Sequence, residues 1–160
     1  MRERENIIFK FNIKDWDYWK YWNYWMAIDP KYLHSDISNS ILQAFYSVRN
    51  LLPYELNIDV YKRALCIEME SLGLSVDCDK EIKINFRDKI VGSFVIDFVV
   101  NDSVVIKAIK DDTTCEHFEA DAKNQLRLTD FEVCLILNFS AESQQQHRRI
   151  VLTNDLKKNK

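Results

Sequence analysis

The chain has 160 residues, a length that fits one compact domain with a sizeable core and leaves no room for a second full domain. Hydrophobic residues make up 47% and charged residues 29%, an ordinary balance for a globular protein. The formal net charge of −3 argues against a broadly basic nucleic-acid binder, so any such binding would have to be local.

The four cysteines lie far apart in the sequence and include no Cys-x-x-Cys pair. Their spacing predicts neither a zinc site nor a disulfide framework, so we expect free thiols in a reducing compartment. No apolar run approaches the ~20 residues that span a bilayer. The first residues, "MRERENIIF", lack the apolar core of a secretory signal. We therefore expect an intracellular protein, in the cytoplasm or an organelle matrix.

The first predicted element is a strand over residues 7–13, "IIFKFNI", in which apolar and polar side chains alternate. The next segment, "DWDYWKYWNYW", holds all four tryptophans of the chain at every third position, with tyrosines between them. These aromatic residues are Trp16, Tyr18, Trp19, Tyr21, Trp22, Tyr24 and Trp25. On a helix, steps of three residues drift by about −60°, so the rings would cover most of the circumference.

Two interpretations of this aromatic segment stay open. It folds across the exposed core of its own domain, or part of it contacts another macromolecule, since Trp and Tyr dominate interface energetics. Stacking on single-stranded bases is disfavoured, because Asp15, Asp17 and Asp29 would repel a phosphate backbone.

The spacing of apolar residues predicts two helices after the aromatic segment. Ser35 or Asp36 is expected to cap a helix over residues 37–50, where apolar residues recur at helical spacing. A second helix runs from about Asn57 along one apolar stripe and stops at Gly73.

The remaining pattern predicts three strands, one helix and two further strands. Their ranges are 81–86, 90–100, 103–109, 114–128, 132–139 and 148–152. The first three strands are expected to form successive hairpins in a buried sheet, and Thr113 or Thr114 to cap the helix. This order predicts a single α/β domain with a mixed sheet flanked by helices.

The order of elements and four strings resemble the GxxExxY proteins, a branch of the PD-(D/E)XK nuclease superfamily with a restriction-endonuclease-like fold. The strings are "VYKRALCIEMESLGL", "SFVIDFVVNDSVVIKAIK", "LRLTDFEVCLILNFS" and "RRIV". We therefore divide the chain into an N-terminal extension over residues 1–36, a PD-(D/E)XK-like domain over 37–152 and a polar tail over 153–160, which is expected to fray.

In such nucleases, carboxylates from adjacent strands and a helix bind Mg²⁺, and a lysine orients or activates the attacking water. The resemblance places the family tyrosine at Tyr61 and the first strand aspartate at Asp97. The other site positions fall on residues that do not match the family pattern: Ile58 for the helix glutamate, Lys107 and Ile109 for Glu-x-Lys, and Asp121 for a polar residue of the later helix.

One acid without partners is a weak Mg²⁺ site, so the resemblance implies a degenerate site and no cofactor. We hypothesise that the Lys107 ammonium fills the old metal position beside Asp97. The predicted function is a catalytically inactive nuclease-like domain that serves as a structural or protein-interaction subunit of a larger intracellular assembly. Two alternatives stay open: a Mg²⁺-dependent nuclease that combines Asp97 with Asp121 or Glu81, and a nucleic-acid-binding module that does not cleave.

Overall fold

The structure is a computed structural model that describes residues 33–143 and 145–157. The chain divides into two units, Met1–Leu33 and His34–Lys160, and all the elements below belong to the second. The predicted strand over residues 7–13 and the aromatic residues between positions 16 and 25 lie outside the described residues. Both interpretations of the aromatic segment therefore stay predictions.

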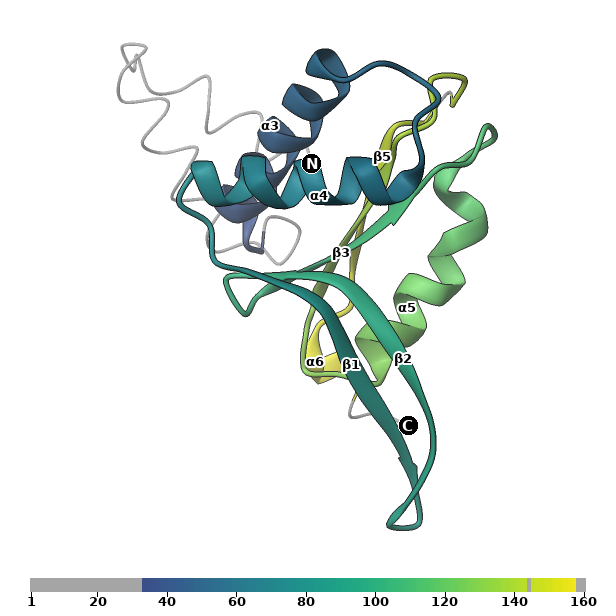
Figure 1. The fold of residues 1–160 in the computed structure, drawn as a ribbon. Coiled ribbons are helices and arrows are strands. Elements are labelled where there is room, and N and C mark those ends of the chain that lie inside the picture. The colour runs from purple at the N-terminus through teal and green to yellow at the C-terminus, as the bar shows by residue number, and fades with distance from the viewer. Residues whose placement is uncertain (1–32, 144, 158–160) are drawn as a thin grey trace, which may run out of the picture. The chain divides into compact units, whose positions relative to one another are not determined.

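The described part of the second unit is an α/β domain built on one five-stranded sheet (Figure 1). In chain order its elements are α3 (Ser35–Leu51), α4 (Ile58–Ser71), β1 (Val76–Phe86), β2 (Lys89–Val100), β3 (Val104–Ile109), the 3₁₀ turn η2 (Cys115–Phe118), α5 (Glu119–Arg127), β4 (Val133–Asn138), β5 (His147–Val151) and α6 (Asn154–Lys157). None of the described helices is both long and apolar enough to cross a bilayer.

The strands lie in the order β1-β2-β3-β4-β5, and every neighbouring pair is antiparallel except the parallel pair β3–β4. The parallel pair requires a crossover, which η2 and α5 supply. The predicted mixed sheet flanked by helices is therefore confirmed, as are the successive hairpins of the first three strands.

Helices cover both faces of the central strands. Val105 and Ile109 of β3 pack with Ala122 and Leu126 of α5 in one buried cluster. Because side chains alternate along a strand, Ile106 points to the opposite face, where α3 and α4 lie (Figure 1). Burial on both faces explains why β3 and β4 are almost continuously apolar.

The ends of α4 agree with the sequence prediction. The Asn57 side chain accepts a hydrogen bond from the backbone N–H of Asp59 at 3.0 Å and caps the start of the helix. At the other end, Gly73 has a φ of +80°, and the N–H of Leu74 donates to the carbonyl of Met69. This is a Schellman motif, in which glycine avoids the strain that a Cβ would bring.

The start of α3 differs from the prediction that Ser35 or Asp36 caps it. The helix already begins at Ser35, and the preceding His34 is in the left-handed region with a φ of 54° and no side-chain cap. Asp36 instead lies in the first turn, where a carboxylate interacts favourably with the helix dipole.

The outer half of the β1–β2 hairpin extends beyond the rest of the sheet (Figure 1), because β3 pairs only with Phe98–Val100. Arg87 and Asp88 form its two-residue turn, with φ values of 47° and 63°. Four of its apolar side chains are more than half exposed: Phe86, Ile90, Val91 and Val95. The prediction that the whole of this hairpin is buried is therefore wrong.

The polar tail also departs from the prediction that it frays. Residues 154–157 form the single turn α6. The Lys157 ammonium donates to the carbonyl of Thr129 at 2.9 Å, and the N–H of Asn154 donates to the carboxylate of Glu132. These bonds hold the tail against the connection between α5 and β4 as far as Lys157.

Candidate functional site

Asp97 lies on β2 where the hydrogen-bond ladder to β3 ends. The outermost pair of that ladder joins Phe98 and Ile106. Beyond it, Asp97 Oδ2 accepts a hydrogen bond at 2.8 Å from the backbone N–H of the buried residue Ala108. The carboxylate thus takes the place of a strand carbonyl and satisfies a buried donor.

The second oxygen of the same carboxylate is bound by a lysine from α4. Lys62 Nζ lies 2.7 Å from Asp97 Oδ1, and the two side chains are only 26% and 19% exposed. Charge-assisted contacts of this length are among the stronger hydrogen bonds in proteins. Both oxygens of Asp97 are therefore engaged by donors of the domain itself.

The hypothesis that Lys107 pairs with Asp97 is wrong. Lys107 Nζ instead lies 2.8 Å from Asp121 Oδ2, at the exposed side of α5. Lys107 shares the strand face of Val105 and Ile109, which packs on α5, so its long side chain reaches an acid of that helix. The predicted ammonium beside Asp97 exists, but α4 supplies it.

The remaining candidate positions do not converge on Asp97. Ile58 is the first residue of α4, and its side chain carries no donor or acceptor. Ile109 is buried in the α5 cluster as part of the hydrophobic core. Glu81 pairs with Val95 in the protruding hairpin, and Asp121 is held by Lys107.

The side chains around Asp97 do not fit a Mg²⁺ site. Magnesium requires near-octahedral oxygen coordination and is usually held by one or two carboxylates with waters and substrate phosphates. Asp97 offers one carboxylate whose oxygens already accept from Lys62 and Ala108. Across residues 33–143 and 145–157, no group of three or more His, Cys, Asp or Glu side chains could hold a metal ion.

A polar cluster that the sequence did not predict lies at the carboxyl ends of the parallel strands β3 and β4. The fully buried Asn138 accepts from the N–H groups of Asp111 and Ser140 and donates to the carbonyl of Asp111. Arg49 of α3 donates to the carbonyls of Asn138 and Ser140. Hydrogen bonds from the Thr113 side chain and backbone lower the pKa of Asp111. These mutual bonds fix the loops that follow the two strands.

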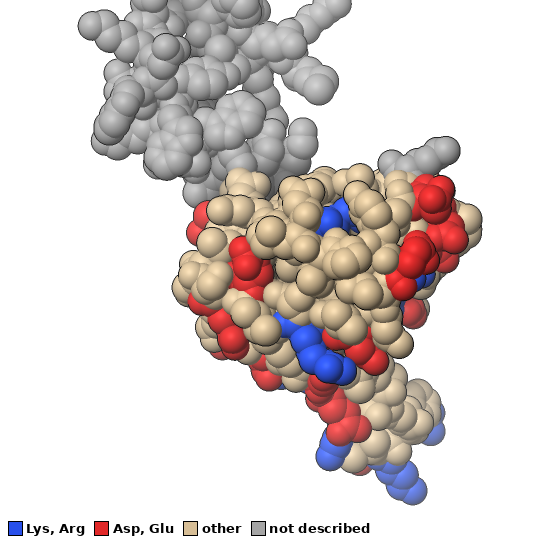
Figure 2. All heavy atoms as spheres, turned by 45° about the horizontal axis from the view of Figure 1, so that its top comes forward, with Lys and Arg blue, Asp and Glu red and all other residues tan. Residues whose placement is uncertain are grey.

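Surface charge on the face shown in Figure 2 is mixed. Lys and Arg side chains lie singly or in small groups between acidic ones, and they form no continuous basic surface on that face. A nucleic-acid groove usually gathers Lys and Arg along the path of the phosphates. This face of the domain does not have that character.

A mixed five-stranded sheet with helices on both faces, and an acid where the ladder between two central strands ends, define a restriction-endonuclease-like α/β domain. The sequence profile of the PD-(D/E)XK nuclease superfamily matches residues 35–150. The chain therefore belongs to the PD-(D/E)XK nuclease superfamily. Searches of curated proteins and of solved structures give no significant match.

Proposed function

We propose that this domain is a member of the GxxExxY branch that has lost nuclease chemistry and acts as a structural or protein-interaction subunit of a larger intracellular assembly. The observation that carries the proposal is the state of Asp97, whose oxygens accept from the Lys62 ammonium and the Ala108 N–H. Tyr61, which lies on α4 one residue before Lys62, supports the assignment to the branch because the sequence resemblance aligns it with the family tyrosine.

The positive charge of Lys62 beside Asp97 supports the proposed loss of catalysis. Hydrolysis of a phosphodiester by this superfamily needs a divalent ion that carries water and neutralises charge on the phosphate. An ammonium 2.7 Å from Asp97 Oδ1 stands where such an ion would bind, and the two cations would repel each other. Ile58 and Ile109 cannot supply the missing carboxylate and lysine.

The proposal predicts that the purified full-length protein gives no metal-dependent cleavage. Labelled DNA and RNA incubated with Mg²⁺ or Mn²⁺ should be cleaved no faster than in excess chelator. Asp97→Ala should leave any background rate unchanged, which would identify that background as a contaminant. A metal-dependent rate that falls at least tenfold in Asp97→Ala would overturn the proposal in favour of a working nuclease with an altered site.

The interaction role predicts specific protein partners. The tagged protein should co-purify with the same proteins from its own cells in repeated preparations, and Trp19→Ala combined with Trp22→Ala should reduce their recovery at least several-fold. Tyr54→Ala is the matched control, because it removes one aromatic ring from an exposed site of the folded domain. Recovery of nucleic acid instead, with a steep dependence on salt, would favour the module that binds without cleaving.

A further inference from the structure

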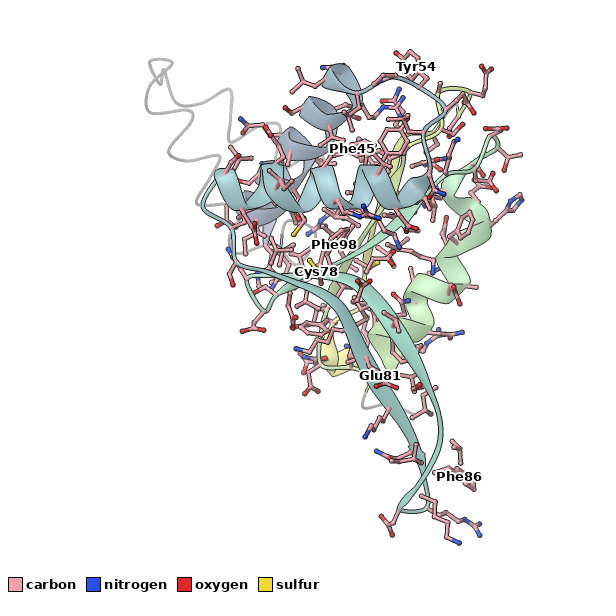
Figure 3. The ribbon with its side chains drawn as sticks, viewed as in Figure 1. Phe45, Tyr54, Cys78, Glu81, Phe86 and Phe98 are labelled. Carbon is pink, nitrogen blue, oxygen red and sulfur yellow. The ribbon has the colours of Figure 1, made fainter. Side chains whose placement is uncertain are left out.

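Two cysteines far apart in the sequence face each other between α4 and β1. Cys66 Sγ and Cys78 Sγ lie 3.2 Å apart, and the two residues are joined by no disulfide. Figure 3 labels Cys78 beside Phe98, where β1 and β2 pass α4, and these two residues are direct partners in the ladder. Cys66 is partly exposed and Cys78 is exposed, so the pair lies at the surface of the domain.

The short distance between the two sulfur atoms and the exposure of the two residues distinguish this pair from the other two cysteines. Cys115 and Cys134 are buried, and the Cys115 Sγ donates a hydrogen bond to the carbonyl of Gln145. A disulfide has an S–S length of about 2.05 Å, so Cys66 and Cys78 need to approach by only about 1 Å to form one. The turn at Gly73 reverses the chain between them and holds the two elements side by side.

We propose that Cys66 and Cys78 form a redox-active dithiol that a low-molecular-weight disulfide, such as oxidised glutathione, converts to an intramolecular disulfide. The Cys66 thiolate attacks one sulfur of the small disulfide, which yields a mixed disulfide and one released thiolate. The Cys78 thiolate then attacks Cys66 Sγ, forms the Cys66–Cys78 bond and releases the second thiolate. The protons of the two cysteines pass to the two released thiolates, so the protein loses two electrons and the reagent gains them.

The electrostatic surroundings of Cys78 bear on the order of the two attacks. Partial desolvation against α4 raises the pKa of the Cys78 thiol, and the hydrogen bond with Cys66 and the charges of Cys66, Asp79 and Glu70 act in the same direction. Because the thiolate is the nucleophile, the raised pKa of Cys78 disfavours it as the first attacking group.

The position of the pair links it to the acid at the candidate site. Cys66 lies one helical turn after Lys62 on the same side of α4. Cys78 pairs with Phe98, the residue next to Asp97. The disulfide would therefore bind α4 to the sheet beside the Lys62–Asp97 contact and hold that contact in place. This inference does not depend on the proposed function, because it concerns the thiols alone.

The test uses the full-length protein equilibrated in buffers with a graded ratio of oxidised to reduced glutathione. Acid quenching, alkylation of free thiols and mass spectrometry of non-reduced peptides should show a Cys66–Cys78 disulfide that forms as the ratio rises and disappears with dithiothreitol. Oxidation closes a short loop, and the midpoint of thermal unfolding should rise by roughly 5–10 °C. Cys78→Ser should trap glutathione on Cys66 and lose this shift.

Cys115→Ala is the matched control, because that thiol lies outside the pair, and it should keep the redox-dependent shift. Free thiols at Cys66 and Cys78 under conditions that oxidise a reference dithiol would overturn the proposal. So would separate glutathione adducts on both residues without an intramolecular bond. A Cys66–Cys78 bond that dithiothreitol fails to reduce in the folded protein would show a structural disulfide, and it would equally refute a redox-active pair.

Discussion

Tyr61→Ala is expected to lower the free energy of unfolding by about 3–5 kcal/mol, as truncation of a large buried aromatic residue usually does. The Tyr61 side chain is only 2% exposed and stacks on Phe139, with ring centroids 5.0 Å apart and an interplanar angle of 12°. Its hydroxyl donates to the carbonyl of Pro53 at 2.7 Å and accepts from the N–H of Leu56. Tyr61 thus holds the connection between α3 and α4 on the sheet.

Tyr61→Phe separates the ring from the hydroxyl. This change keeps the stacking and removes two hydrogen bonds, so we expect it to cost about 1–2 kcal/mol. Urea unfolding followed by far-ultraviolet circular dichroism measures both variants. Tyr54→Ala removes a tyrosine that is 65% exposed and should stay within about 0.5 kcal/mol of the wild type. Equal losses for Tyr61→Ala and Tyr54→Ala would show that Tyr61 has no special structural role.

Local signals in the sequence were sufficient for those elements whose ends are set by their own residues. Asn57 and Gly73 delimit α4 because a cap and a left-handed turn depend on neighbouring backbone groups. Thr114 caps the turn before α5 in the same way, by accepting from the N–H of Glu116. The continuous apolar runs of β3 and β4 indicated strands that are covered on both sides.

The errors arose where tertiary packing decides the outcome. Ile90 and Val91 look like residues of a buried strand, but no third strand pairs with that half of β2, and they stay exposed. The tail looks like a frayed end, yet Lys157 finds carbonyl acceptors 28 and 26 residues earlier in the chain, at Thr129 and Phe131. Neither outcome follows from residue types within a short window.

At the candidate site, too, some features could be predicted from the sequence and others depend on tertiary packing. Asp97 was identified through the family resemblance, which places the first strand aspartate within the string "SFVIDFVV". Its partner Lys62 was not identified, because it is 35 residues away on a helix and no local pattern relates the two residues. The choice between Lys62 and Lys107 depends on which face each side chain occupies, and only the packing of α4 and α5 against the sheet settles that.

Lys62→Met is expected to lower the free energy of unfolding by about 1–3 kcal/mol, because it leaves the Asp97 carboxylate largely desolvated with a single backbone donor. Asp97→Asn removes the charge but keeps an oxygen that can accept from Ala108. In that background Lys62→Met should cost less than half as much, which is the coupling that a double-mutant cycle measures. Urea unfolding of the four proteins gives this value.

Lys110→Met is the matched control for this cycle. Lys110 Nζ lies 3.2 Å from Glu55 Oε2, but the Glu55 side chain is 68% exposed, so the loss should not exceed about 1 kcal/mol. An equal cost of Lys62→Met with and without the Asp97 charge would contradict an energetic coupling between Lys62 and Asp97.

Lys62→Met also tests the loss of catalysis. This variant removes the ammonium beside Asp97 and so exposes the carboxylate to a metal ion. Metal-dependent cleavage should still be absent, because Ile58 and Ile109 supply neither the second carboxylate nor the lysine that hydrolysis requires.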